Sequence, residues 1–198
     1  MIMVRFADDI VCGFQYESDA RRFWEAMRKR LQEFSLSLHP VKTRLIEFGR
    51  FAAINRKQRG LGKPETFTFL GFVLICGCSL RGRFFVKRKT RRDRMRSTLK
   101  GIREGLRRRL HRPIPETGKW LGQVVAGYFA YHAVPSNIRA LTAFRHHVVS
   151  AWRWTLHRRS QRGKMIWERV KQLADDYLPK PEILHPWPEQ RFAVKHPR

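Results

Sequence analysis

Residues 4–14 read VRFADDIVCGF, and this stretch decides how the first part of the chain is expected to fold. Asp8 and Asp9 stand between two short apolar runs, which predicts a β-hairpin with the acidic pair at its tip. Taken alone, an aspartate pair in a turn is typical of a solvated turn, because aspartate side chains bond to the turn backbone. The rest of the sequence changes that interpretation.

The chain is strongly basic: its 198 residues include 42 Lys and Arg against 16 Asp and Glu, a formal net charge of +26. Such self-repulsion predicts a polyanionic partner. Nucleic acid is the commonest one, and an anionic membrane surface is the competing explanation. Six Trp and 14 Phe predict an ordered core rather than a disordered basic tail. No apolar run reaches the length of a bilayer span, which predicts a soluble intracellular protein without membrane contacts.

Strand and helix signals are mixed in residues 1–89, which predicts an α+β first domain. Ser18 is expected to cap a helix, which Pro40 is expected to stop. The apolar residues of this helix recur every three or four positions: Phe23, Met27, Leu31 and Phe34. Residues 43–48 are expected to form a strand and residues 49–65 an exposed loop.

Residues 66–80 and 82–88 are two further β-rich runs, separated by a short turn, and they predict a second hairpin. Beyond residue 89 the pattern becomes helical. Amphipathic helices are expected over residues 90–112, 117–132, from 136 onward, and over 165–177. Residues 90–160 are therefore predicted to form a helical bundle. Residues 161–198 should add a short helix and an extended, Pro-rich tail that begins at Pro179.

The first of these helices is the most basic part of the chain. Between Arg81 and Arg112 there are fifteen Lys or Arg against two acidic residues, Asp93 and Glu104. Most charge runs are solvated faces, but like charges three or four residues apart each oppose a helix by about 0.2–0.5 kcal/mol, so this face favours an anionic partner. The candidate nucleic-acid-binding residues are Arg91, Arg92, Arg94, Arg96, Lys100, Arg103, Arg107 and Arg108. Most aromatic residues of the bundle are expected in its core, and Trp154 is the expected exposed exception.

Four blocks occur in an order that is similar to one protein family. Phe6-Ala7-Asp8-Asp9 resembles the [YF]-x-D-D signature of reverse transcriptase palms. LHPVKTRLIEFGR (38–50) is similar to the segment that carries a lysine near the nucleotide phosphates, and FTFLGF (67–72) resembles the hairpin that grips the primer end. Residues 121–161 resemble the thumb or maturase region of bacterial group II intron-encoded reverse transcriptases. Any one block is weak, but four in the right order make a strong match.

The resemblance implies the second half of a reverse transcriptase palm over residues 1–89, followed by a thumb. Asp8 and Asp9 would be catalytic and would hold Mg²⁺ for two-metal nucleotidyl transfer, while Lys42 would assist the phosphates. A primer-grip role is implied for Phe69, Leu70, Gly71 and Phe72. The implied partners are group II intron-like RNA, an RNA/DNA primer-template and, in a complete enzyme, dNTP. A bacterial cytoplasmic protein associated with RNA or the nucleoid is expected.

Two departures from the family pattern stand out. Phe6 replaces the usual tyrosine, which removes a hydroxyl able to contact nucleic acid. The sequence also begins just before the motif, so the fingers and the first palm half, with its metal-binding aspartate, are expected to be missing. The chain is therefore expected to be a fragment that is inactive alone and pairs with a missing N-terminal polymerase half.

Three functions remain open from the sequence. The first is part of an RNA-directed DNA polymerase that uses Mg²⁺. The second is a non-catalytic RNA-binding maturase module that assists intron splicing. The third is a basic nucleic-acid-binding domain with no intron connection, which would show no preference for structured RNA over duplex DNA.

Overall fold

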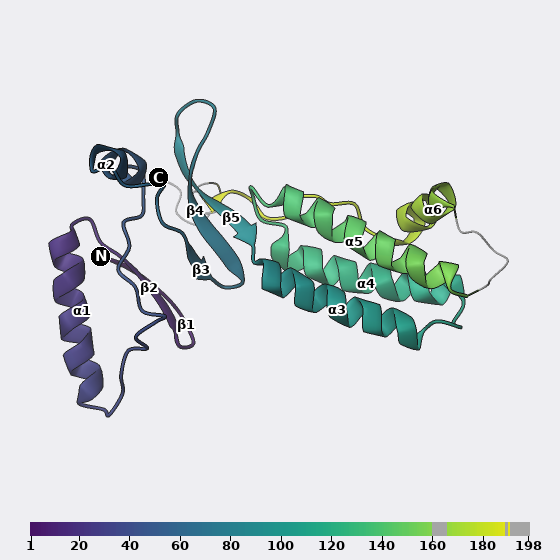
Figure 1. The fold of residues 1–198 in the computed structure, drawn as a ribbon, viewed down its shortest axis with the longest axis horizontal. Coiled ribbons are helices and arrows are strands. Elements are labelled where there is room, and N and C mark those ends of the chain that lie inside the picture. The colour runs from purple at the N-terminus through teal and green to yellow at the C-terminus, as the bar shows by residue number, and fades with distance from the viewer. Residues whose placement is uncertain (160–165, 189, 191–198) are drawn as a thin grey trace. The chain divides into compact units, whose positions relative to one another are not determined.

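The computed structural model describes residues 1–159, 166–188 and 190. These residues form a mixed α and β fold with six helices and two small antiparallel sheets (Figure 1). The predicted mixture of helices and strands is therefore confirmed. The chain divides into two compact units, Met1–Glu65 and Thr66–Arg198. No helix within the described ranges combines the length and the apolar character needed to cross a membrane.

The first unit opens with the predicted hairpin. Strand β1 (Ile2–Phe6) pairs antiparallel with β2 (Asp9–Gly13), and Phe6 lies opposite Asp9 at the closing end. The two-residue turn therefore consists of Ala7 and Asp8. Ala7 has a φ of +52°, and a positive φ at the first central residue is the pattern of a type II′ turn. The predicted acidic hairpin tip is confirmed.

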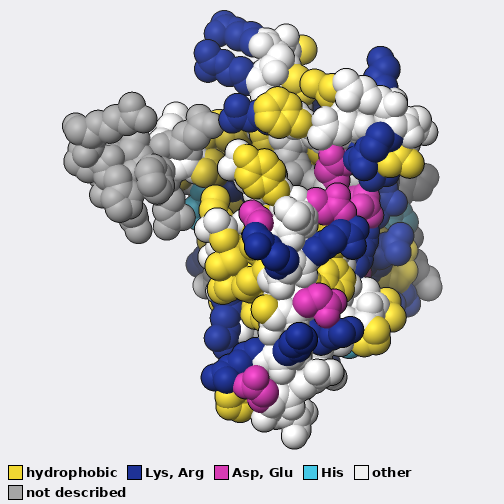
Figure 2. Space-filling model, turned by 90° about the vertical axis from the view of Figure 1, so that its left-hand side faces the viewer, with side chains coloured by type: hydrophobic (Ala, Val, Ile, Leu, Met, Phe, Trp, Pro, Cys, Tyr) yellow, Lys and Arg dark blue, Asp and Glu magenta, His cyan; other side chains and the backbone are white. Residues whose placement is uncertain are grey.

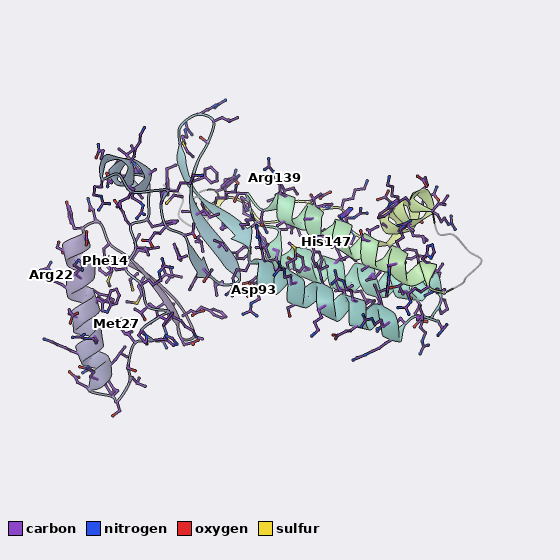
Figure 3. The ribbon with its side chains drawn as sticks, in the orientation of Figure 1. Phe14, Arg22, Met27, Asp93, Arg139 and His147 are labelled. Carbon is purple, nitrogen blue, oxygen red and sulfur yellow. The ribbon has the colours of Figure 1, made fainter. Side chains whose placement is uncertain are left out.

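Helix α1 (Glu17–Gln32) follows the hairpin. The predicted Ser18 cap was wrong: the N-cap is Tyr16, and the acidic side chains of Glu17 and Asp19 instead complement the positive end of the helix dipole. The apolar side of α1 packs on the hairpin through Phe14 and Phe23, whose ring centroids lie 5.3 Å apart. Figure 3 shows two side chains of this helix, Arg22 and Met27, projecting from opposite sides.

The connection from α1 to the second unit differs from the sequence-based expectation. The helix ends at Gln32, well before Pro40, and residues 43–48, expected to form a strand, form neither a strand nor a helix. The expected loop 49–65 contains helix α2 (Ala52–Gln58). This short helix is stabilised by tertiary contacts, because Ala52 is buried and Asn55 donates to the Glu47 carboxylate at 2.9 Å.

The second unit begins with a three-stranded sheet of order β3-β4-β5, formed by Phe67–Phe69, Phe72–Cys78 and Phe84–Thr90. The predicted β-rich run 66–80 is thus two strands, joined at Leu70-Gly71. Both turn residues have positive φ, +47° and +75°, which is the geometry of a type I′ hairpin turn. Leucine rarely adopts this conformation, so local propensity did not reveal the turn.

Four helices complete the second unit: α3 (Arg92–Arg108), α4 (Ile114–His132), α5 (Ile138–His157) and α6 (Trp167–Tyr177). Their core is continuous, and its large fully buried side chains include Trp152, Phe144, Leu106, Leu121 and Leu141. The predicted helices are present, with small shifts at their ends. Helix α4 starts three residues early because Pro115 fits the first helical turn, where a missing N–H costs nothing.

The tail after α6 runs without helix or strand over the second unit, as predicted, through residue 187, and residues 188 and 190 are helical. The backbone N–H groups of Leu184 and His185 both donate to the carbonyl of Ala133, at 3.0 and 3.1 Å. Most of the rest of the predicted tail lies outside the described residues. The strands β3, β4 and β5 belong to the same compact unit as the helices, and the division between the two compact units falls at residue 65.

Candidate nucleic-acid interface

Helix α3 buries one apolar side and exposes basic side chains over much of the rest of its circumference. Leu99, Ile102 and Leu106 are buried in the core of the second unit. All seven Lys and Arg side chains within the helix are exposed: Arg92, Arg94, Arg96, Lys100, Arg103, Arg107 and Arg108. The eighth predicted residue, Arg91, is half-buried at the N-cap and makes an ion pair with Asp93 at 2.6 Å. We call the seven exposed side chains the α3 basic face.

The α3 basic face differs from the other arginine-rich helix of the protein. On α1, four arginines are paired with acids of the same helix: Arg21 with Glu17, Arg22 with Asp19, Arg28 with Glu25 and Arg30 with Glu33. Figure 2 shows the corresponding mixture of basic and acidic side chains over the α1 side. In the described part of the chain, none of the seven α3 side chains has an ion-pair partner. The arginines of α1 are thus neutralised by nearby acids, whereas those of α3 are not.

The start of α3 is held against the β3–β4 turn, which contains the predicted primer-grip residues. The Tyr131 hydroxyl donates to the Leu70 carbonyl at 2.8 Å, and the Arg91 N–H donates to the Gly71 carbonyl at 3.0 Å. Phe72 is only 8% exposed, and its ring stacks on that of Tyr131 with 5.7 Å between centroids. The turn is therefore fixed on the C-terminal end of α4.

A buried polar residue joins the sheet to the helices. Asn137, 2% exposed, accepts a hydrogen bond from the Thr90 N–H at 3.0 Å through its side-chain oxygen. Its side-chain nitrogen donates to the Thr90 hydroxyl at 2.7 Å and to the His132 carbonyl at 2.8 Å. Ser136 adds a further bond by accepting from the Arg88 N–H at 3.0 Å. These contacts hold β5, α4 and α5 at the point where α3 begins.

Sequence reasoning missed the residues of this junction: Tyr131, Ser136 and Asn137. Their signal was present but weak, since a Ser-Asn pair after Pro135 is also typical of an ordinary helix start. The structure assigns Asn137 a larger role, because it satisfies backbone groups of two other segments that burial removes from water.

His132 lies in the same junction, between aromatic rings. Its ring stacks on Tyr128 at 4.1 Å and tilts against Phe72 at 5.5 Å. Burial lowers the pKa of His132 below the ordinary 6.5, and the hydrogen-bonding position beside the Tyr128 carbonyl opposes this shift only in part. Burial also raises the pKa of Tyr128 to about 12, so its hydroxyl stays neutral. The buried junction therefore favours the neutral forms of both the His132 and the Tyr128 side chains.

The lowered pKa of His132 predicts a pH-dependent stability. The unfolded chain binds the proton more readily than the folded chain, so this residue's contribution is present above pH 6.5 and is lost as the pH falls below it. Urea unfolding of the second unit should show a lower free energy of unfolding at about pH 5.5 than at about pH 7.5. In His132→Phe the difference should shrink, whereas the exposed-site control His157→Gln should keep it. An unchanged difference in His132→Phe would contradict the assignment.

The predicted catalytic residues lie in the first unit. Asp8 and Asp9 are both exposed at the hairpin tip, and in the described chain neither carboxylate has a hydrogen-bond or ion-pair partner. Lys42 is exposed in the turn after Pro40, where its N–H donates to the His39 ring nitrogen at 3.4 Å. No ion pair joins the Lys42 ammonium to either aspartate within the described residues.

The hairpin tip fits Mg²⁺ in ligand type. Mg²⁺ takes oxygen ligands and is commonly held by one or two carboxylates together with water and substrate phosphates. Asp8 and Asp9 provide two such carboxylates, free of competing partners and adjacent on a short hairpin. No three His, Cys, Asp or Glu side chains of the described residues gather to hold a metal by themselves. Asp8 and Asp9 would therefore supply at most two of the oxygen ligands that Mg²⁺ takes.

Comparison with known proteins adds no assignment: no family model, curated protein or solved structure matches this chain. The functional conclusion therefore depends on the α3 basic face, the junction around Asn137 and the hairpin tip.

Proposed function

We propose that this chain binds RNA through the α3 basic face, as the palm and thumb portion of a group II intron-type reverse transcriptase. The observation that carries the proposal is that all seven basic side chains of α3 are exposed and have no ion-pair partner among the described residues. A row of arginines on one helix is suited to the phosphates of a nucleic-acid backbone, since the guanidinium group binds phosphate oxygens in pairs.

The junction supports the same proposal. The β3–β4 turn is hydrogen-bonded to the N-terminal end of α3 through Gly71 and Arg91. A strand bound along α3 would therefore have a fixed position relative to Leu70 and Gly71, as a primer grip requires. The Phe72 side chain is buried, so contact with a primer would fall to the turn backbone and to Phe69.

The hairpin tip supplies the catalytic part of the proposal. Asp8 and Asp9 would hold Mg²⁺, which in this chemistry activates a primer hydroxyl and stabilises the leaving pyrophosphate. Lys42 would neutralise phosphate charge from its exposed turn. Both carboxylates are exposed, and neither has a hydrogen-bond or ion-pair partner among the described residues.

A second function is favoured by the division into units. The α3 basic face and the Asn137 junction belong to the second unit, whereas Asp8 and Asp9 belong to the first. The second unit has a continuous core of its own. A non-catalytic maturase module that stabilises folded intron RNA would need only this unit.

The double variant Asp8→Asn, Asp9→Asn separates the two functions. Primer extension on poly(rA)/oligo(dT) with Mg²⁺, assayed with the chain alone and with a fingers-and-palm polypeptide added, should fall by at least roughly 100-fold in the variant. Affinity for structured RNA should stay the same, because the two aspartates belong to the first unit and the α3 basic face belongs to the second.

The outcomes discriminate sharply. Extension that persists in the double variant would contradict a catalytic role for the hairpin tip. Loss of RNA affinity together with extension would show that the aspartates act through folding. RNA binding and splicing assistance without extension under either condition would select the maturase module.

A further inference from the structure

Helix α5 carries an exposed aromatic side chain on a face that the core does not use. Trp154 is 52% exposed, which confirms the expectation from the sequence. His147 precedes it by seven residues and Arg158 follows it by four, so all three share one face of the helix. The Arg158 guanidinium carbon lies 4.6 Å from the centroid of the Trp154 ring. Figure 3 labels His147 on this helix, together with Arg139 near its start.

The other arginine–tryptophan contacts of the bundle are different. Arg109 lies over Trp120 and Arg153 lies over Trp167, but these two rings are half-buried and pack against the core. They are explained by packing alone. Trp154 gains no such burial, so its exposed ring has no structural explanation within the described part of the unit.

Helices α3 and α5 are neighbours that run parallel. At one end the Thr90 N–H bonds to Asn137, and at the other the Arg159 guanidinium donates to the Arg109 carbonyl at 3.3 Å. The two residues in contact are 47 positions apart in the sequence at the first contact and 50 positions apart at the second. A residue of α5 thus lies beside the residue of α3 that precedes it by 47 to 50 positions. Trp154 therefore lies level with residues 104–107 of α3, the part of the α3 basic face that contains Arg107.

Helical periodicity places Trp154 on the same side as three members of the α3 basic face, Arg96, Arg103 and Arg107. Arg145 bonds to α6 through the Ala174 carbonyl at 2.8 Å, and Trp154, nine residues later, lies half a turn away from α6. On α3, a Cβ at Gly105 would clash with Trp120 of α4. Arg96, nine residues before Gly105, lies on the side opposite α4 and toward α5, and Arg103 and Arg107 share that side.

We propose that this surface, formed by His147, Trp154 and Arg158 of α5 and by Arg96, Arg103 and Arg107 of α3, binds single-stranded RNA, with Trp154 stacking on an unpaired base. The proposal rests on the RNA binding proposed above and deepens it. Helix α5 contains no acidic residue, so phosphates meet no repulsion there. Arg158 covers one face of the indole and leaves the other for a base, and such stacking requires a base that is not already stacked in a duplex.

The test compares Trp154→Ala with wild type in fluorescence-anisotropy titrations of an oligouridine strand and of an RNA duplex of equal length. The variant should bind oligouridine about 5- to 150-fold more weakly, the range expected for one lost stacked base, and bind the duplex as wild type does. Trp154→Phe should recover part of the affinity. Trp187→Ala, which removes another exposed tryptophan of the second unit, should leave both affinities unchanged.

The proposed function and this inference can fail separately. Wild-type protein that binds neither RNA would overturn both. Wild-type binding that Trp154→Ala leaves unchanged for oligouridine would overturn only the stacking inference. An equal loss for single strand and duplex would also overturn it, and circular dichroism of the variant would show whether a folding defect caused that loss.

Discussion

Replacing Arg96, Arg103 and Arg107 together by glutamine is expected to weaken RNA binding about 100-fold at low salt, because each side chain loses a charge-assisted phosphate contact of about 1 kcal/mol. None of the three has an ion-pair partner in the described chain, so their removal leaves no acid unpaired. Helix formation should be unchanged or slightly favoured, because glutamine removes repulsion between neighbouring arginines.

The salt dependence gives a second measure of the same variant. Three lost phosphate contacts should lower the slope of log K against log salt by about 2 for a single strand and nearer 3 for a duplex. Anisotropy titrations at several salt concentrations would give both slopes. A loss of affinity with an unchanged slope would contradict direct phosphate contact.

The matched control changes the same number of charges on α1. Arg21, Arg22 and Arg28 are exposed but paired with Glu17, Asp19 and Glu25. Glutamine at these three positions lowers the net charge equally, yet should reduce RNA affinity only slightly. An equal loss in the two triple variants would mean that net charge alone drives binding and that the α3 basic face has no special role.

Asn137→Ala is expected to have the largest effect on stability, lowering the free energy of unfolding of the second unit by roughly 2–4 kcal/mol. The substitution leaves the Thr90 N–H and the His132 carbonyl without their side-chain partner in a buried site. Urea unfolding would measure the loss. Hydrogen exchange should show faster exchange in β5 and at the start of α3, since Asn137 connects them to the helices.

A control for this variant lies on the same helix. Thr142→Ala removes an exposed hydroxyl that bonds only to the Ile138 carbonyl within α5, and it should change stability by less than about 0.5 kcal/mol. If Asn137→Ala were as mild as Thr142→Ala, the junction would not hold the sheet to the bundle.

The elements that could be predicted from the sequence share a local cause. The hairpin at Asp8 and Asp9 and the amphipathic helices follow from apolar residues that recur every two residues in strands and every 3.6 residues in helices. Such repeats can be recognised within a short segment of sequence. The failures have a different cause. Helix α2 depends on contacts with Glu47 from outside the helix, and the Leu70–Gly71 turn holds a leucine at positive φ that contacts from α4 and α3 help to fix.

The sequence by itself determined the excess of positive charge, the acidic hairpin tip and the faces of the helices, because composition and periodicity require no knowledge of distant partners. The tertiary structure decided which charges remain free and which segments are joined. Both α1 and α3 are rich in arginine, and the folded structure shows which of these side chains meet acids: four arginines of α1 are paired, whereas those within α3 have no ion-pair partner among the described residues. The role of Asn137 likewise exists only once Thr90, 47 residues away, is brought to its side chain.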